Sequence, residues 1–267
     1  RAILSGPSGP AVSLIKTHSR TWMHPLAGIT QLSILEQTNL LMASTNIDHQ
    51  QLKIVSFNMH GYNQGSHALH ELISDALSLP AVFMLQEHWL TPAAMNKFDD
   101  DFPDYICVGC SAMTERVESG MLFGRHFEGV AILTHKSLRG ALRTIHCDDR
   151  FAIVKIYNYV VISVYLPCVG TPDRFIICEN IIERIGSWLD QYDDCEYIIG
   201  GDFNVNLNDN HEIARCINDF IVDRHLHRCD ELFPSSASAT YINPSLGHSS
   251  YIDYMLVSRA DVLLDFT

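Results

Sequence analysis

The segment Gly200-Gly201-Asp202-Phe203-Asn204 follows an apolar run at residues 197–199. It places a carboxylate and an amide two positions apart, just past an expected buried strand. Gly and Asp also occur at strand ends for turn geometry alone. The same side chains could serve phosphodiester hydrolysis, which needs a nucleophile and neutralisation of the charge that develops on the phosphate.

Three other apolar runs carry polar groups of the same kind. Asn58 and Gly61 follow the run at 54–57, Glu87 follows the run at 81–86, and Asp253 lies inside the run at 251–258. Acidic side chains are rarely fully buried unless they are paired or bind a metal. Each residue alone could be a strand-end cap or turn, but together they predict one polar site at the edge of a sheet.

In this order, the motifs resemble the endonuclease/exonuclease/phosphatase superfamily of DNase-I-like and apurinic endonuclease-like metal-dependent phosphoesterases. The resemblance covers residues 52 to 267 and rests on six ordered segments: Asn58 with Gly61, Gln86-Glu87, Gly129 to Leu133, Ser163 to Pro167, Gly200 to Asn204, and Tyr251 to Tyr254. The segment Leu85 to Leu90 is more similar to the endonuclease domains of non-LTR (LINE-type) retrotransposons, because the repair enzymes usually carry Thr-Lys after the Glu.

The resemblance implies a role for each matched residue. Glu87 is the expected principal metal ligand, and a hard carboxylate oxygen suits Mg²⁺, with Mn²⁺ as the alternative. Asn58 is expected beside it, orienting Glu87 or the metal. Asp202 is expected to orient and deprotonate the attacking water, whereas Asn204 and Tyr165 are expected to bind phosphate oxygens.

The C-terminal part departs from the family pattern. In the family, the residue matching Asp253 pairs with a His of a downstream Ser-Asp-His segment, which does not occur before Thr267. His248 lies on the wrong side of Asp253 to replace it. We therefore expect the fragment as given to be severely impaired, because the phosphate lacks a charge-assisted donor.

Two smaller departures lie near the expected site. His60 stands two positions after the motif Asn, where relatives often carry an acidic or amide residue, and this argues against a second metal contact there. Glu128 stands where a second Gly is common. We expect it to alter a surface turn without affecting the chemistry.

Length and composition are compatible with one domain. The 267 residues can build a single sizeable core. Residues 1–50 show no clear periodicity of apolar residues and are predicted to be a poorly ordered leader or linker. Residues 51–267 are predicted to form the endonuclease/exonuclease/phosphatase domain, truncated before its Ser-Asp-His segment. Without a long apolar run or a signal peptide, we expect no membrane association, an intracellular location, and a nuclear one when acting on DNA. Because Arg1 stands in place of an initiator Met, we expect a longer protein. The resemblance to retrotransposon endonucleases implies a reverse transcriptase downstream.

The eight cysteines are spread along the chain and are expected to be reduced thiols. A zinc site is the alternative interpretation for one subset: Cys107, Cys110, His225, His227 and Cys229.

The net charge of -13 is unfavourable for binding a polyanion, which normally uses a basic face. One stretch of basic residues could contact phosphates or could equally form a solvated edge: Lys136, Arg139, Arg143, Arg150 and Lys155.

Apolar spacing predicts a helix over 66–79 and a second helix after Thr171, which would cap it, with Pro172 in the first turn. Strands are expected near 53–57, 81–86, 104–108, 129–134, 151–156, 160–166, 196–200 and 251–257. This mixture predicts an α/β protein with two sheets and helices outside. The resemblance implies the specific four-layered α/β sandwich, with two packed mixed β-sheets flanked by helices.

The leading functional hypothesis is a Mg²⁺-dependent endonuclease that nicks target DNA to prime reverse transcription. The same residues could instead hydrolyse abasic-site DNA, RNA, or lipid phosphoesters. A third alternative is a catalytically inactive fragment that retains only the fold.

Overall fold

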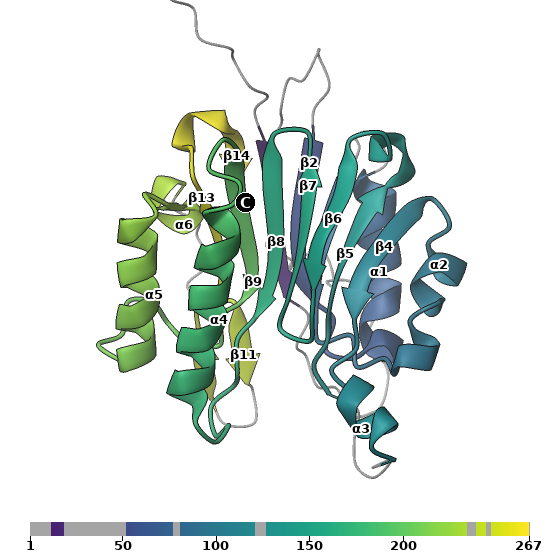
Figure 1. The fold of residues 1–267 in the computed structure, drawn as a ribbon, viewed down its shortest axis with the longest axis horizontal. Helices are drawn as coiled ribbons and strands as arrows, with labels where there is room; N and C mark the ends of the chain where they lie inside the picture. Colours follow the sequence, from purple (N-terminus) through teal and green to yellow (C-terminus); the bar gives the residue numbers. More distant parts are fainter. Residues whose placement is uncertain are drawn as a thin grey trace, which may run out of the picture.

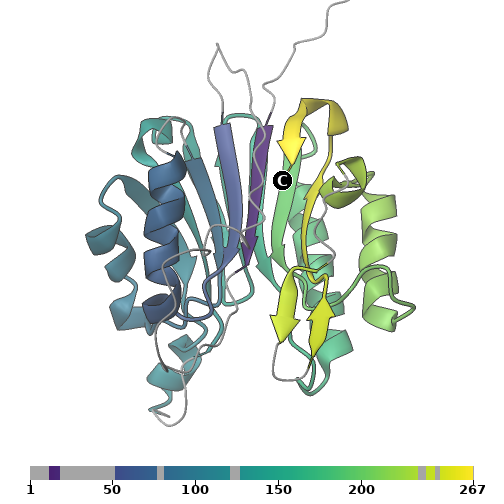
Figure 2. The same cartoon turned by 180° about the vertical axis from the view of Figure 1, so that it is seen from behind.

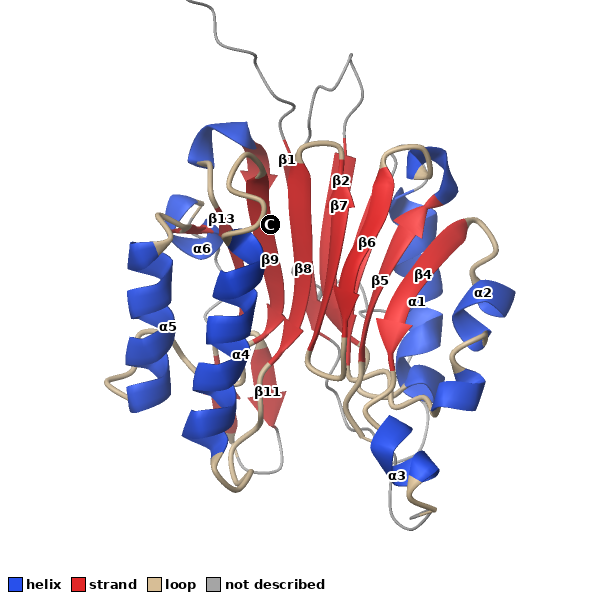
Figure 3. Ribbon diagram, viewed as in Figure 1, coloured by secondary structure: helices blue, strands red, loops and turns tan. Residues whose placement is uncertain are grey.

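Two β-sheets pack face to face, with helices on both outer faces (Figure 1). The computed structural model describes residues 12–18, 52–76, 81–120, 127–233, 239–243 and 247–266. Figure 3 shows the resulting order of layers, in which helices lie outside the two sheets. The predicted four-layered α/β sandwich is confirmed.

In the described residues, the first sheet has the strand order β14-β1-β2-β3-β5-β4. β1, β2 and β3 run parallel, whereas β5 is antiparallel to both β3 and β4. α1 links β2 to β3 and lies on the outer face with α2 (Figure 1). The bounds are β1 Val12–His18, β2 Leu52–Asn58, α1 Tyr62–Ala76, β3 Ala81–Gln86, α2 Lys97–Asp101, β4 Tyr105–Cys110, α3 Thr114–Glu118, β5 Val130–His135 and β14 Leu263–Phe266.

The second sheet has the order β10-β13-β9-β8-β7-β6, and α4 and α5 cover its outer face (Figure 1). A hairpin of β11 and β12 precedes β13. Short 3-10 turns occur at Pro92–Ala94, Lys136–Leu138 and Ala260–Val262. The remaining bounds are β6 Leu142–Cys147, β7 Phe151–Ile156, β8 Tyr159–Tyr165, α4 Arg174–Leu189, β9 Glu196–Asp202, α5 Glu212–Asp223, β10 His227–Arg228, α6 Cys229–Leu232, β11 Tyr241–Asn243, β12 His248–Ser250 and β13 Asp253–Val257.

Burial of apolar surface between the layers is the main stabilising contribution. Between the sheets, Met84, Ile132 and Met255 are fully buried. Beneath α4 and α5, a second cluster surrounds the outward side chains of β8 and β9. The predicted apolar stripe of α4 is confirmed for five residues that are buried: Cys178, Ile181, Ile182, Ile185 and Leu189. Trp188, the sixth residue of the stripe, is half-buried.

Several boundaries differ from the prediction. α1 begins at Tyr62, four residues before the expected start. The predicted cap at Thr171 is wrong, because the Thr171 N–H donates to Cys168 in a turn and α4 begins at Arg174, after Asp173. α5 and β6 were not predicted. β6 is an edge strand of mixed polar and apolar residues, and it lacks the regular alternation of the two that would have predicted a strand.

One strand lies inside the segment for which a leader was expected. β1 pairs in parallel with β2 along its whole length, and Figure 2 shows it in purple beside β2. The remainder of residues 1–50 lies outside the described part of the chain, and so does Thr267. Within the described residues, no helix combines the length and apolar composition needed to cross a membrane.

Candidate active site

The predicted polar residues meet at one edge of the two sheets, the edge from which α3 projects in Figure 1. Asn58 ends β2, Glu87 directly follows β3, Tyr165 ends β8, Asp202 ends β9 and Asp253 begins β13. All five are buried, with exposed fractions between 0% for Asp202 and 7% for Glu87. The two sheets therefore bring together residues that are far apart in the sequence.

Asn58 joins the two halves of this site. Its Nδ2 donates to Glu87 Oε1 at 2.8 Å and to Asp202 Oδ2 at 2.8 Å. Its Oδ1 accepts from the backbone N–H of His60 at 3.0 Å. Because ionised carboxylates only accept, the NH₂ group must face them, and both hydrogen bonds are charge-assisted. Asn58 therefore fixes one carboxylate from each sheet.

Three site residues form a row across the second sheet. Tyr165 is the register partner of Asp202, and Asp202 is the register partner of Asp253. Directly opposed residues point to the same face of a sheet. Burial, followed by the nearby charges of Glu87 and Asp202, raises the pKa of Tyr165. The phenol consequently stays protonated and can donate a hydrogen bond.

Asn204 lies beside Asp202 but is turned toward the backbone. Its N–H donates to Asp202 Oδ1 at 2.9 Å, and its Nδ2 donates to Leu166 O at 2.8 Å. Asn204 has a φ of 54°, which a non-glycine residue adopts at an energetic cost. Within the described part of the chain, one amide hydrogen is used by Leu166, which leaves the second for a ligand.

The two glycines before Asp202 are required by close packing. A Cβ on Gly201 would lie 1.9 Å from Val164 O in β8, and a Cβ on Gly200 would lie 2.4 Å from Met84 Cε in the opposite sheet. Gly201 also has a φ of 153°. The glycines therefore let β9 approach its neighbours and place Asp202 at the site.

Gln86 anchors the strand end that carries Glu87. It is fully buried, and its Nε2 donates to Ser163 Oγ at 3.0 Å, across the interface between the sheets. Ser163 Oγ in turn lies 3.3 Å from Leu85 O. The sequence motif contained Gln86 without indicating this role, because the partner Ser163 lies in a distant strand.

The loops after β2 and β3 are fastened to each other. Gly61 N donates to Glu87 O at 2.7 Å, and His60, Glu87 and Trp89 all have positive φ angles. Such strained conformations persist only where their surroundings hold them. The strain here surrounds the candidate metal ligand.

His88 is a second anchor that sequence analysis did not identify. It is fully buried, and burial lowers its pKa to about 4, so the ring is neutral at pH 7. Its Nδ1 accepts from Leu90 N at 3.0 Å, which leaves Nε2 to donate to Cys110 O at 3.1 Å. The neutral ring therefore ties the Glu87 loop to β4.

Glu128, which we expected to alter a surface turn without affecting the chemistry, lies close to the candidate site. Glu128 Oε1 lies 2.9 Å from Arg150 Nη2, and both side chains are largely buried. The Arg150 guanidinium lies 5.8 Å from the centroid of the Tyr165 ring. Burial is the main reason why the pKa of Glu128 is raised, and the charge of Glu87 adds to it.

The predicted basic stretch is divided. Arg150 lies beside Tyr165, whereas Lys136 and Arg139 follow the end of β5 that pairs with the start of β3. Arg143 and Lys155 also lie toward this far end, because they pair with each other and with the beginning of β8. Only Arg150 of this stretch supplies a positive charge near the candidate site.

The donor atoms at the site fit a hard cation better than zinc. No group of three or more His, Cys, Asp or Glu side chains in the described residues is arranged as a metal cage. Cys107 and Cys110 lie in an edge strand of the first sheet, whereas His227 and Cys229 lie at the far edge of the second. Mg²⁺ needs only one or two carboxylates and keeps several waters. Glu87, with Asn58 and Asp202 beside it, meets that requirement.

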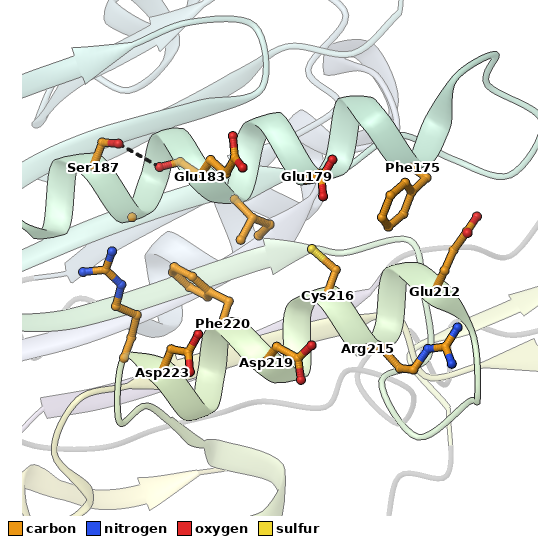
Figure 4. Close-up of a pocket in the computed structure, with 13 residues that line it drawn as sticks. Phe175, Glu179, Glu183, Ser187, Glu212, Arg215, Cys216, Asp219, Phe220 and Asp223 are labelled. Carbon is orange, nitrogen blue, oxygen red and sulfur yellow. Dashed lines mark hydrogen bonds between the residues drawn. The ribbon is translucent and has the colours of Figure 1, made fainter.

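A separate groove of about 790 Å³ lies between α4 and α5 (Figure 4). It contains none of the predicted site residues. Its lining is rich in acidic side chains, which repel a polyanion: Glu179, Glu183, Glu212, Asp219 and Asp223. The buried cluster at the sheet edge is therefore the better candidate for phosphoester chemistry.

Residues 55–267 match the model of the Endonuclease/Exonuclease/phosphatase family, and the chain belongs to this family. Its members are nucleases and phosphatases that generally use divalent metals. No curated protein sequence matches the chain.

Solved structures share the fold at low sequence identity. A 3'-5' exonuclease from Neisseria meningitidis is 18% identical with a TM-score of 0.60, covering 78% of this chain and 88% of that chain. A 3' phosphatase from Neisseria bound to a product DNA hairpin is 17% identical with a TM-score of 0.58, and the match covers 78% of this chain and 87% of that chain. An AP endonuclease from Archaeoglobus fulgidus is 17% identical with a TM-score of 0.57, covering 78% and 86%.

Proposed function

We propose that this protein is a Mg²⁺-dependent DNA endonuclease of a non-LTR retrotransposon, which nicks target DNA to prime reverse transcription. The observation that carries the proposal is the Asn58 amide, which holds Glu87 and Asp202 at 2.8 Å each in a buried site. Family membership supports phosphodiester hydrolysis as the reaction class.

Glu87 is the proposed ligand of Mg²⁺, or of Mn²⁺ in its place, and Asn58 keeps its carboxylate in position. A bound divalent cation supplies positive charge where negative charge develops on the phosphate. Asp202 orients the attacking water and accepts its proton. Tyr165 donates its phenolic hydrogen to a phosphate oxygen, because its raised pKa keeps it protonated. Asn204 provides its second amide hydrogen to the phosphate.

Asp253 has a positioning role in this proposal. It is the register partner of Asp202, and its N–H donates to Thr240 Oγ1 at 3.1 Å. A carboxylate at this position can hold and charge an imidazole that reaches the phosphate.

The retrotransposon assignment rests on the segment Leu85 to Leu90, in which His88 and Trp89 replace the Thr-Lys usual in repair enzymes. The buried His88 and its hydrogen bonds to Leu90 and Cys110 give this segment a structural role in supporting Glu87. In this proposal DNA is the partner, a reverse transcriptase follows in the same polypeptide, and the protein acts in the nucleus.

Nicking of supercoiled plasmid tests the proposal. The assay compares residues 1–267, a form that continues through the Ser-Asp-His segment expected from the family, and the Asp202→Asn variant of each. We expect the longer form to nick in Mg²⁺ or Mn²⁺ but not in EDTA, and residues 1–267 to nick much more weakly. The Asp202→Asn variant of each form is expected to nick about 10²- to 10⁴-fold less. Parallel reactions use an abasic-site duplex, single-stranded RNA, and vesicles containing phosphoinositide. If one of these substrates is cleaved and the plasmid is not nicked, the proposed DNA nicking is wrong and hydrolysis of that substrate is the activity. If the longer form is inactive on every substrate, the domain is catalytically inactive.

A further inference from the structure

Arg174 ties together the two loops that carry the proposed phosphate-binding side chains. It is the first residue of α4, and its guanidinium donates through Nε to Pro167 O at 2.9 Å and through Nη2 to Asn204 O at 2.7 Å. Pro167 lies two positions after Tyr165 at the end of β8, and Asn204 lies two positions after Asp202 at the end of β9. One side chain therefore spans the ends of two neighbouring strands.

Asn204 needs such support because its backbone is strained. Its φ of 54° lies in the left-handed region, which a non-glycine residue adopts only where its surroundings hold it. Three hydrogen bonds do so here. The Asn204 N–H donates to Asp202 Oδ1, its side chain donates to Leu166 O, and its carbonyl accepts from Arg174. The bond from Arg174 is the one of these three that fixes the carbonyl.

A guanidinium suits this role better than an ammonium would. Its N–H donors lie in one rigid plane, so Nε and Nη2 reach two acceptors at once in a fixed geometry. Hydrogen bonds from a charged donor are also shorter and stronger than neutral ones. A lysine in place of Arg174 would keep the charge but would carry its donors on one nitrogen. It could not reproduce both bonds, to Pro167 O and to Asn204 O, in this geometry.

We propose that Arg174 is a positioning residue for phosphate binding. By holding the Asn204 backbone, it directs the second amide hydrogen of Asn204 toward the phosphate, and it does so without contacting the substrate itself. Misplacing a catalytic group by about 1 Å costs on the order of 10²-fold in rate. The role of Asn204 in this inference rests on the proposed nicking activity, whereas the hydrogen bonds that Arg174 makes do not.

Plasmid nicking by the longer form of the protein provides the first test. Arg174→Ala is expected to lower kcat about 10²-fold and to change KM less than about 3-fold, because the displaced donor acts in the transition state. Arg174→Lys is expected to lower kcat about 10-fold, since it keeps at most one of the two bonds. Guanidinium chloride at low concentration should restore part of the activity of Arg174→Ala. The control Arg215→Ala removes an exposed guanidinium from α5 and should change none of these values.

A double-mutant cycle shows whether Arg174 acts through Asn204. Asn204→Gly removes the amide side chain and accepts a positive φ without strain. Adding Arg174→Ala to Asn204→Gly is expected to lower nicking by less than about 3-fold further, because no side chain is left to position. The rescue by guanidinium should also disappear. If Arg174→Ala instead lowers nicking equally in both backgrounds, Arg174 acts independently of Asn204 and the inference is overturned.

Amide hydrogen exchange separates this inference from the proposed function, because it needs no substrate. We expect the Asn204 N–H to exchange at least about 10-fold faster in Arg174→Ala than in the unsubstituted protein or in Arg215→Ala, as measured by NMR. Unchanged exchange would overturn the inference even if nicking falls. If the unsubstituted protein does not nick, the proposed function is wrong, and exchange alone decides whether Arg174 holds Asn204. Arg174→Lys takes the place of Arg174→Ala if the latter does not fold.

Discussion

Asn58 and Asp202 are separated by 144 positions in the sequence, yet Asn58 Nδ2 donates to Asp202 Oδ2 at 2.8 Å in the buried interior. The same nitrogen also donates to Glu87. One neutral amide thus stabilises two carboxylates that belong to different sheets. The following predictions depend on this arrangement and on the packing around it.

Replacement of Asn58 by Asp is expected to destabilise the protein more than replacement by Ala. Asn58→Asp brings a third carboxylate between two buried ones, at a cost of about 3–5 kcal/mol, whereas Asn58→Ala loses hydrogen bonds worth about 1–3 kcal/mol. Urea unfolding in EDTA measures both. Mg²⁺ should recover part of the loss in Asn58→Asp. Equal stability of the two variants in EDTA would contradict the bridging role of the amide.

Asp202→Asn is expected to reduce nicking about 10²- to 10⁴-fold, because the residue that orients and deprotonates water is lost. Its stability in EDTA is expected to fall by about 1–3 kcal/mol, because both Asp202 oxygens accept hydrogen bonds and the amide keeps only one acceptor. Plasmid nicking and thermal unfolding are measured on the same preparations. Asp219→Asn, an exposed change on α5, is the matched control and should alter neither.

Gly201→Ala is expected to destabilise the protein by about 3 kcal/mol or more, because the added Cβ would lie 1.9 Å from Val164 O. Gly140→Ala is the control, since a Cβ there meets nothing within 4 Å. It should be neutral or stabilising by about 0.4–1 kcal/mol. Urea midpoints compare the two. A tolerated Gly201→Ala would show that β8 and β9 can separate without cost.

Protonation of His88 is expected to make stability depend on pH. Burial lowers the pKa of His88 from 6.5 to about 4 in the folded protein, so between these values the unfolded chain binds a proton that the folded protein does not. Stability should therefore fall as the pH decreases through this window, by about 3 kcal/mol in total for this group. His88→Gln should remove that contribution. Urea titrations of both proteins at pH 4 to 7 measure the difference in slope.

The strand ends of the candidate site could be predicted because their signal is local. Asn58, Glu87 and Asp202 each follow an apolar run, and an acid at the end of a buried strand is unusual without a partner or metal. The strands at 81–86 and 151–156 were predicted with both bounds correct for the same reason. The nicking assay of Asp202→Asn tests the catalytic role expected for one of these residues.

Contacts between distant segments could not be predicted from local patterns. Gln86 with Ser163 and Glu128 with Arg150 each join two segments that no sequence spacing relates. The stretch containing Lys136 and Arg150 failed as a cluster for the converse reason. β6 and β7 form an antiparallel hairpin. Arg150 lies in its turn, near the candidate site, whereas Arg143 and Lys155 lie toward the other end of the two strands.

The division of the site between the two sheets also has a consequence for biosynthesis. The earlier half of the chain supplies Asn58 and Glu87, and the later half supplies Asp202 and Asp253 through β9 and β13. During translation, Asn58 and Glu87 emerge first, Asp202 follows with β9, and Asp253 emerges only with β13. The complete set of carboxylates therefore comes together only when synthesis of the fold is nearly finished.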